Sequence, residues 1–168
     1  GAMNTLNKDI RELRKRLSDG SIQRAYREIV SYMSRLRKKF TDQRGERAAG
    51  ALYQGYFDMT FFSLFSDELK KRDLKLAVVF NYESFGFEVW LAARNRKIQK
   101  QYWKLFLDAD YKKHRLVEPA AGIDAIVTAV LAENYPQEDE DSLTTRIVAG
   151  VTAFERDMLS FLIEADAP

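Results

Sequence analysis

The sequence predicts a single α+β domain with two N-terminal helices, a mainly antiparallel sheet of about four strands, a helix after the central hairpin and a C-terminal helix. Near both ends of the chain, apolar residues recur every three or four positions, which is the period of an amphipathic helix. Over residues 75–92, apolar and polar residues alternate in two runs, which is the period of a strand. The length of 168 residues and the 46% hydrophobic share suit one globular domain.

Two helices are expected before the sheet. Apolar residues over 6–17 are spaced four, three and four apart, which predicts a short amphipathic helix that stops at Gly20. Ser21 is a suitable N-cap for a longer helix, whose apolar stripe runs over residues 22–40. The charged segment 42–49 is then expected to be a loop.

An aromatic-rich stretch, residues 52–65, predicts a long strand, because tyrosine and phenylalanine favour strands. Gly55 inside this stretch is expected to mark a bulge or a close approach of the backbone. Ser66 is the predicted cap of a short helix that runs to Arg72 and leads into the hairpin.

The central hairpin is predicted from two alternating runs that each carry one strongly apolar face. For the two faces to coincide, an antiparallel pairing has to set Tyr82 near Phe87 and Phe80 near Val89. Such a pairing needs a connection of even length. We predict four residues, 83–86, with the terminal glycine supplying any positive φ that the turn requires.

The second half of the chain is predicted to hold a helix, a strand and a final helix. Asn95 is the expected cap of a helix that ends near Asp108, and residues 110–119 are expected to form a surface loop. Residues 123–131 are β-branched enough for a further strand, although their alanines leave a helix as the alternative. Ser142 is the predicted cap of the C-terminal helix, which an apolar stripe marks clearly.

Composition restricts the setting in which the protein works. The domain is predicted to span residues 3–165, because Gly1-Ala2 ahead of Met3 has the form of a protease scar from an expression vector. There is no run of about 18 apolar residues that would cross a membrane. The chain has no cysteine, which excludes disulfides and thiolate zinc sites and favours a cytoplasmic location.

Charge is distributed unevenly along the chain although the net charge is only +2. Residues 1–48 carry 13 basic and 6 acidic side chains, whereas residues 133–168 carry 2 and 9. This asymmetry is explained most simply if the basic first helices pack beside the acidic last helix, and steering of an anionic partner is the alternative. The acidic run 138–141 is expected to be an exposed connection.

Several motifs follow one another in a specific order. They are Tyr-Gln-Gly-Tyr-Phe-Asp-Met-Thr at 53–60, the strand 74–80, Phe-Glu-Val-Trp-Leu at 87–91, Asn95, the segment 99–103 and the helix start at 21–26. In this order they resemble an uncharacterised family of small bacterial proteins with no established activity. The resemblance covers nearly the whole chain and implies a shared fold, but it assigns no functional residue.

Four cations surround the predicted helix start at Asn95 and form the first candidate site. Positive charge at a helix N-terminus opposes the helix dipole, so a compensating anion is an attractive explanation. Exposed N–H groups of the first turn and two or three cationic side chains would bind a phosphate or a carboxylate. Solvated side chains, or pairing with the acidic run 138–141, are the simpler alternative. The four cations are Arg94, Arg96, Lys97 and Lys100.

A mixed sheet face supplies the other candidates, Tyr56, Asp58, Glu88 and Trp90. The predicted order of elements loosely resembles the restriction-endonuclease-like core, which places metal-binding acids and a lysine on adjacent strands. This resemblance implies Asp58 and Glu88 as metal ligands, and the simpler alternative is that both are hydrogen-bonded acids under a loop or a helix. Trp90 stands where the lysine is expected, so Lys97 or Lys100 would have to provide the charge.

The leading functional hypothesis is a non-enzymatic binding or interaction protein that holds an anionic small molecule or a protein partner at the basic start of the Asn95 helix. A degenerate metal-dependent phosphodiesterase is the second hypothesis, and nucleic-acid binding through the basic first half is the third. No cofactor, no metal and no membrane partner is expected. His114 is the single histidine and is expected to be exposed within its Lys-Lys-His-Arg run.

Overall fold

Helices and one antiparallel sheet make up the fold, so the predicted α+β class is confirmed. The structure is a computed structural model that describes residues 1–136 and 139–166. In chain order the elements are α1 (Ala2–Leu17), α2 (Ser21–Arg44), the 3-10 helix η1 (Glu46–Ala48), β1 (Met59–Leu64), α3 (Asp67–Lys70), β2 (Leu74–Asn81), β3 (Gly86–Ala93), α4 (Arg96–Asp108), β4 (Arg115–Leu116), β5 (Ala125–Ala132) and α5 (Glu140–Ala165). The five strands that the described residues form are ordered β1-β2-β3-β5-β4, against about four predicted, and β4 lies in the predicted loop 110–119.

The central hairpin, β2 and β3, fixes which side chains lie on which face of the sheet. Its connection has four residues, as predicted, but it comprises residues 82–85 rather than 83–86. Phe80 accordingly pairs with Phe87 and not with Val89, which corrects the predicted register. The shift is two residues, and because side chains alternate with a period of two, every residue keeps its predicted face.

The turn of the hairpin uses its glycine differently from the prediction. The positive φ, 54°, belongs to Phe85 and not to Gly86. Gly86 is needed because β5 comes close: a Cβ atom there would lie 2.6 Å from the carbonyl oxygen of Ala132. The glycine therefore serves the packing of β3 against β5 rather than the turn itself.

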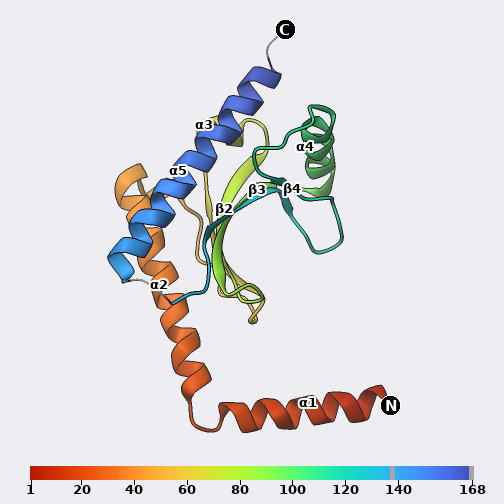
Figure 1. The fold of residues 1–168 in the computed structure, drawn as a ribbon, viewed down its shortest axis with the longest axis vertical. Coiled ribbons are helices and arrows are strands. Elements are labelled where there is room, and N and C mark those ends of the chain that lie inside the picture. Colours follow the sequence, from red (N-terminus) through yellow and green to blue (C-terminus); the bar gives the residue numbers. More distant parts are fainter. Residues whose placement is uncertain (137–138, 167–168) are drawn as a thin grey trace.

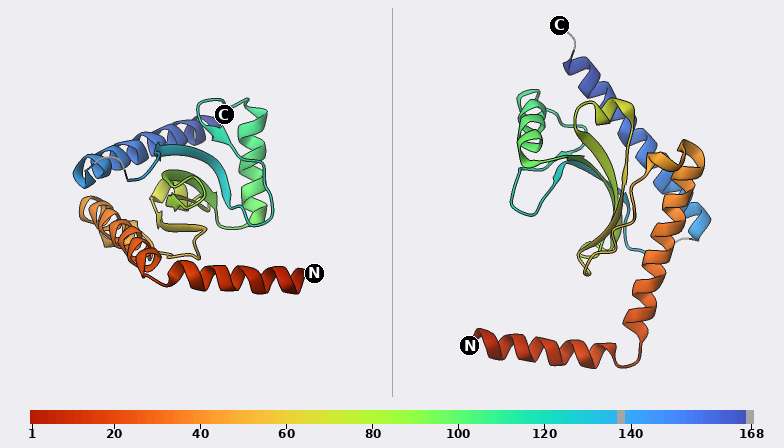
Figure 2. Two further views of the ribbon diagram at one scale, coloured as in Figure 1. Left: turned by 60° about the horizontal axis from the view of Figure 1, so that its bottom comes forward. Right: turned by 180° about the vertical axis from the view of Figure 1, so that it is seen from behind.

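Two helices seal one face of the sheet. Figures 1 and 2 show α2 and α5 side by side over this face, with α4 on the opposite side of the sheet. The β2 residues Leu76, Val78 and Phe80 are fully buried in one core cluster with Met33 of α2 and Ile147 of α5. This side of the sheet is therefore a conventional hydrophobic core.

Ion pairs join the two covering helices. Arg35 Nη2 of α2 lies 2.7 Å from Glu140 Oε1 of α5, and Arg44 Nη1 lies 3.0 Å from Glu155 Oε1. The Arg44 pair is largely shielded from solvent, so it is screened less than a surface pair. For α2, the expectation that basic N-terminal helices pack beside the acidic C-terminal helix is confirmed.

Helix ends differ from the prediction in two places. The N-cap of α2 is Gly20, not Ser21, and α2 runs on to Arg44, so that the predicted loop 42–49 is mostly helical. The N-cap of α5 is Asp139, whose Oδ1 accepts a hydrogen bond from the N–H of Ser142 at 2.9 Å. Residues 137–138, which belong to the predicted acidic connection, lie outside the described residues.

Residues 52–65 do not form the single long strand that the sequence predicts. The chain turns back at Gly55, which has a φ of 79°, so that Tyr53 pairs with Phe61 of β1. A Cβ atom on Gly55 would lie 1.8 Å from the carbonyl oxygen of Met59. The predicted close approach of the backbone is confirmed, but it creates a turn rather than a bulge in a continuous strand.

The first helix stands apart from the rest of the molecule. α1 is helical as predicted, and it extends away from the sheet and from the other helices (Figures 1 and 2). None of its residues is buried. Over residues 1–136 and 139–166, the structure contains no helix with the length and apolar character needed to span a bilayer.

A matched pair of glycine substitutions tests the turn at Gly55. Gly55→Ala is expected to lower the free energy of unfolding by about 2–4 kcal/mol, because positive φ is combined with a backbone clash. Gly122→Ala has the same positive φ but no atom within 4 Å of the new Cβ, so it should cost only about 1 kcal/mol. Urea denaturation measures both. Equal losses would show that residues 55–59 do not form this turn.

Candidate functional site

The face of the sheet opposite the core is only partly covered. Alternation in the central hairpin places Lys75 and Ala77 of β2 on this face, together with their cross-strand partners Ala92 and Trp90 of β3. Phe61 of β1 extends the face toward the sheet edge. We call it the open face, because α2 and α5 lie on the other side.

A groove of about 850 Å³ lies on the open face. This volume is within the usual range for small-molecule sites. Strands form its floor, the 55–59 turn and the start of α4 border it, and the loop around residue 123 closes one side. The groove, as we use the term, is lined by Tyr53, Asp58, Met59, Phe61, Phe65, Lys70, Asp73, Leu74, Lys75, Ala77, Trp90, Ala92, Ala93, Arg94, Asn95, Arg96, Gln99, Gly122, Ile123 and Asp124.

The start of α4 is built as predicted at Asn95 and is fastened to the loop beside it. Asn95 Oδ1 accepts a hydrogen bond from the N–H of Ile98 at 2.9 Å. Arg96 Nη1 donates to the carbonyl oxygen of Ala120 at 2.8 Å. Gln99, only 2% exposed, donates to the carbonyl oxygen of Ile123 at 2.8 Å. These bonds give the groove a fixed wall, and they engage part of the Arg96 guanidinium.

The four predicted cations fall into two groups. Arg94 and Arg96 line the groove, whereas Lys97 and Lys100 are exposed on α4 and do not. Arg94 is paired only loosely, with Nη1 3.5 Å from Asp73 Oδ1. Because that pair is well exposed to solvent, it holds the guanidinium weakly and leaves it free to meet a ligand.

Trp90 forms part of the groove floor, and Glu88 fixes its orientation. The indole Nε1 donates to Glu88 Oε1 at 2.9 Å, and Asn81 Nδ2 donates to Glu88 Oε2 at 3.0 Å. Glu88 itself does not line the groove. It acts on the groove through Trp90, because a tryptophan with a satisfied N–H presents its ring in one orientation.

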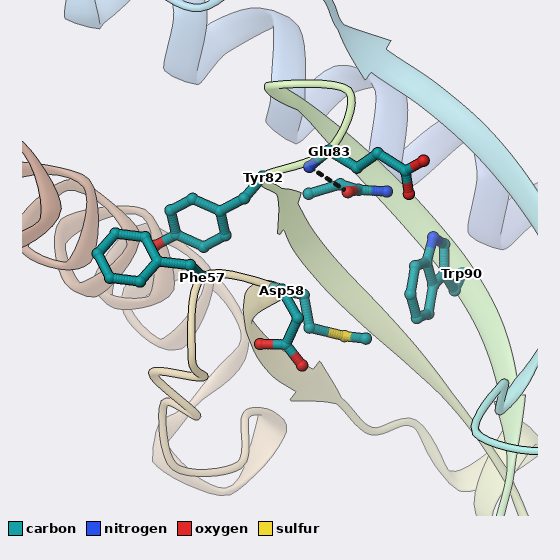
Figure 3. Close-up of a pocket in the computed structure, with 7 residues that line it drawn as sticks. Phe57, Asp58, Tyr82, Glu83 and Trp90 are labelled. Carbon is teal, nitrogen blue, oxygen red and sulfur yellow. Dashed lines mark hydrogen bonds between the residues drawn. The ribbon is translucent and has the colours of Figure 1, made fainter. Parts of the chain in front are cut away.

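Asp58 lines both the groove and an adjoining side pocket of about 430 Å³. Figure 3 shows this side pocket with Phe57 and Tyr82 together on one side and Trp90 on the other. Asp58 Oδ1 accepts a hydrogen bond from the N–H of Tyr56 at 2.9 Å. Tyr56 is 87% exposed and lines neither cavity. Of the four residues predicted on the mixed face, Asp58 and Trp90 line the groove, whereas Tyr56 and Glu88 do not.

Tyrosine side chains fasten the 55–59 turn to the body of the protein. Tyr26 Oη of α2 donates toward the carbonyl oxygens of Gln54 and Gly55, both at 2.9 Å. Tyr82 Oη lies 2.8 Å from Thr60 Oγ1, and burial raises the pKa of the Tyr82 phenol. The turn that borders the groove is therefore held from two sides.

His114 contacts Asp157 and Phe154 of α5. The prediction that His114 is exposed was wrong. The imidazole Nε2 lies 2.9 Å from Asp157 Oδ2, and the side chain is largely shielded. Lys113 Nζ reaches the other oxygen of Asp157 at 3.0 Å. These hydrogen bonds, with the one to His114 first, lower the pKa of Asp157 and tie the segment before β4 to α5.

Metal-binding geometry is not supported by the described residues. Within them no three His, Cys, Asp or Glu side chains gather closely enough to hold a metal ion. The two acids of the phosphodiesterase hypothesis are also already engaged, Glu88 by Trp90 and Asn81, and Asp58 by backbone N–H groups.

Several lining residues were missed by the sequence analysis. Lys75 could have been found, because it alternates with Ala77 and Val79 and so shares a face with Trp90. Ile123 was predicted to begin a strand, but β5 begins at Ala125, and Ile123 lies with Gly122 in the loop that closes one side of the groove. The fold of the segment between β4 and β5 brings both residues there.

Acid titration tests the anchoring of the 55–59 turn by Asp58. Hydrogen bonds from the N–H groups of Tyr56 and then Met59 lower the pKa of Asp58 in the folded protein. Relative to an ordinary aspartate pKa of about 3.9, this contribution to stability is present above that pH and is lost as the pH falls through the lowered folded pKa. Carboxyl-carbon NMR should therefore show Asp58 titrating below about 3.9. A midpoint at or above that value would show that the turn is not anchored in this way.

Comparisons with known proteins bear on the family rather than on the site. Neither the curated proteins nor the solved structures contain a match to this chain. The family model described as Domain of unknown function (DUF7000) matches residues 6–162, which is nearly the whole chain. The resemblance to an uncharacterised family is thus confirmed, and the chain belongs to the DUF7000 family.

Proposed function

We propose that this protein is a non-enzymatic binding protein that holds an anionic ligand in the groove on the open face of its sheet. The ligand combines a flat apolar part with a negatively charged group. We propose the cytoplasm of a bacterial cell as the location of the protein, because a cysteine-free chain needs no oxidising compartment.

The observation that carries the proposal is the combination of aromatic floor and cationic rim. Trp90, Phe61 and Tyr53 line the groove, and the rings of Tyr53 and Phe61 are 5.0 Å apart. Aromatic side chains that line a cavity of this volume are typical of a ligand site. A planar apolar group would bury this aromatic surface with little loss of conformational freedom.

Cations at one end of the groove favour a negative charge on the ligand. Lys75 and Arg94 line the groove beside the start of α4, and neither is tied as firmly as Arg96. Asp58, Asp73 and Asp124 also line the groove, so it is not uniformly positive. An anion placed between Lys75 and Arg94 would replace the weak pair of Arg94 with Asp73 by a stronger, less hydrated contact.

Nucleic-acid binding has less support. Of the basic residues on α2, Arg35 and Arg44 pair with acids of α5, and Arg37 donates to the carbonyl oxygen of Gly50 at 2.7 Å. Side chains engaged within the protein are poorly placed to neutralise phosphates.

Ligand binding is tested with pairs of compounds that differ only in charge. The panel contains AMP with adenosine, and aromatic carboxylates and sulfonates with their neutral analogues. In a Trp103→Phe background, fluorescence reports on Trp90 alone, because the chain has two tryptophans. Charged members are expected to quench this signal and to raise the melting temperature, and Arg94→Gln or Lys75→Gln should weaken binding by about five- to tenfold.

Lys97→Gln is the matched control, since it removes a cation from the same helix start outside the groove. It should change affinity by less than about twofold. The proposal fails if no anionic compound is preferred over its neutral analogue, or if Lys97→Gln weakens binding as much as Arg94→Gln does.

A further inference from the structure

α1 carries an apolar stripe that nothing in the described part of the chain covers. The side chains of Met3, Leu6, Ile10 and Leu13 are between 52% and 70% exposed. They lie on a helix that leaves the body of the protein at Gly20 (Figures 1 and 2). Isolated helices of this length are marginal in water, so an exposed stripe of this kind favours a partner.

The spacing of the stripe identifies the kind of partner. Its apolar residues follow one another at intervals of three, four, three and four, from Met3 to Leu17. This is the heptad seam of a coiled coil, narrower than the face of a helix that packs on a globular core. Met3, Ile10 and Leu17 then occupy the a positions, and Leu6 and Leu13 the d positions. The β-branched Ile10 at the central a position, with leucine at both d positions, favours a parallel two-stranded coiled coil.

Charges beside the seam are complementary to a second copy of the same helix. Asp9 falls at g and Arg14 at e of the next heptad, five residues later. In a parallel pair these are the positions that meet across the interface, so symmetry creates two Asp9–Arg14 contacts. An identical helix therefore supplies the opposite charge at both flanks.

The placement of the lysines of α1 argues against a lipid surface. Lys8 and Lys15 fall at f, on the side of α1 away from the seam. A helix lying on an anionic membrane uses cations that flank its apolar stripe. Arg14 and Arg16 do flank the stripe here, but Asp9 shares that flank and Arg16 Nε is paired with Glu12 Oε1 at 2.9 Å. The lysines would point away from the lipid, whereas in a coiled coil they simply face water.

We propose that α1 is a dimerisation arm that pairs in parallel with α1 of a second copy of this chain. The seam spans only about two heptads, and the polar face is basic, so the dimer is weak and its population depends on protein concentration. Sedimentation velocity from about 5 µM to about 500 µM should show monomer converting to dimer. Ile10→Lys should abolish the dimer and leave the melting temperature of the body unchanged, because Ile10 is exposed in the monomer.

Charge exchange provides the decisive version of the experiment. Asp9→Arg and Arg14→Asp each place like charges across both flanks, so each variant alone should dimerise about tenfold more weakly. Mixed together, they restore two opposite-charge contacts, and a heterodimer should form at about wild-type affinity. Lys15→Asp is the matched control and should leave dimerisation within about twofold of wild type.

The inference is overturned if the wild-type chain stays monomeric to about 500 µM. It is also overturned if mixing Asp9→Arg with Arg14→Asp restores nothing, or if Ile10→Lys dimerises as the wild type does. Co-sedimentation with vesicles of anionic phosphatidylglycerol tests whether α1 binds a lipid surface instead. If the wild-type chain binds these vesicles and does not dimerise, α1 is a membrane-binding helix and the proposal is wrong.

Discussion

The alternation of side chains along β2 and β3 is the constraint on which the structure depends. A four-residue connection keeps the apolar rows of both strands on one face, where α2 and α5 seal them. The same alternation leaves Lys75, Ala77 and Trp90 on the other face. One covered and one open face are therefore two consequences of a single register, and a shift by one residue would destroy both.

Within the open face, hydrogen bonding separates residues that build the groove from residues that are available to a ligand. The carboxylate of Glu88 accepts hydrogen bonds from Trp90 and Asn81. The guanidinium of Arg96 donates one to the carbonyl oxygen of Ala120. Loss of either side chain would remove hydrogen bonds that hold the floor or the wall of the groove in place. Arg94 contacts Asp73 at 3.5 Å in solvent, which costs little to break. A ligand gains most from side chains of this second kind.

Local patterns in the sequence were sufficient for part of this arrangement. Alternation predicted the faces of β2 and β3, and Asn95 was a reliable cap because its side chain acts on a neighbour three residues away. Aromatic content was misleading over residues 52–65, because the positive φ and close packing at Gly55 reverse the chain there. The exact hairpin pairing, off by two residues, is set by turn geometry that composition does not encode.

The central claim is that the open face binds an anion, and a chemical-shift map tests it most directly. Titration of the ¹⁵N-labelled protein with the tightest compound of the charged series should shift the indole N–H of Trp90 and the backbone amides of Lys75 and Arg94, with little change along α2 and α5. Shifts confined to α2 and α5, or spread evenly over the surface, would contradict the account.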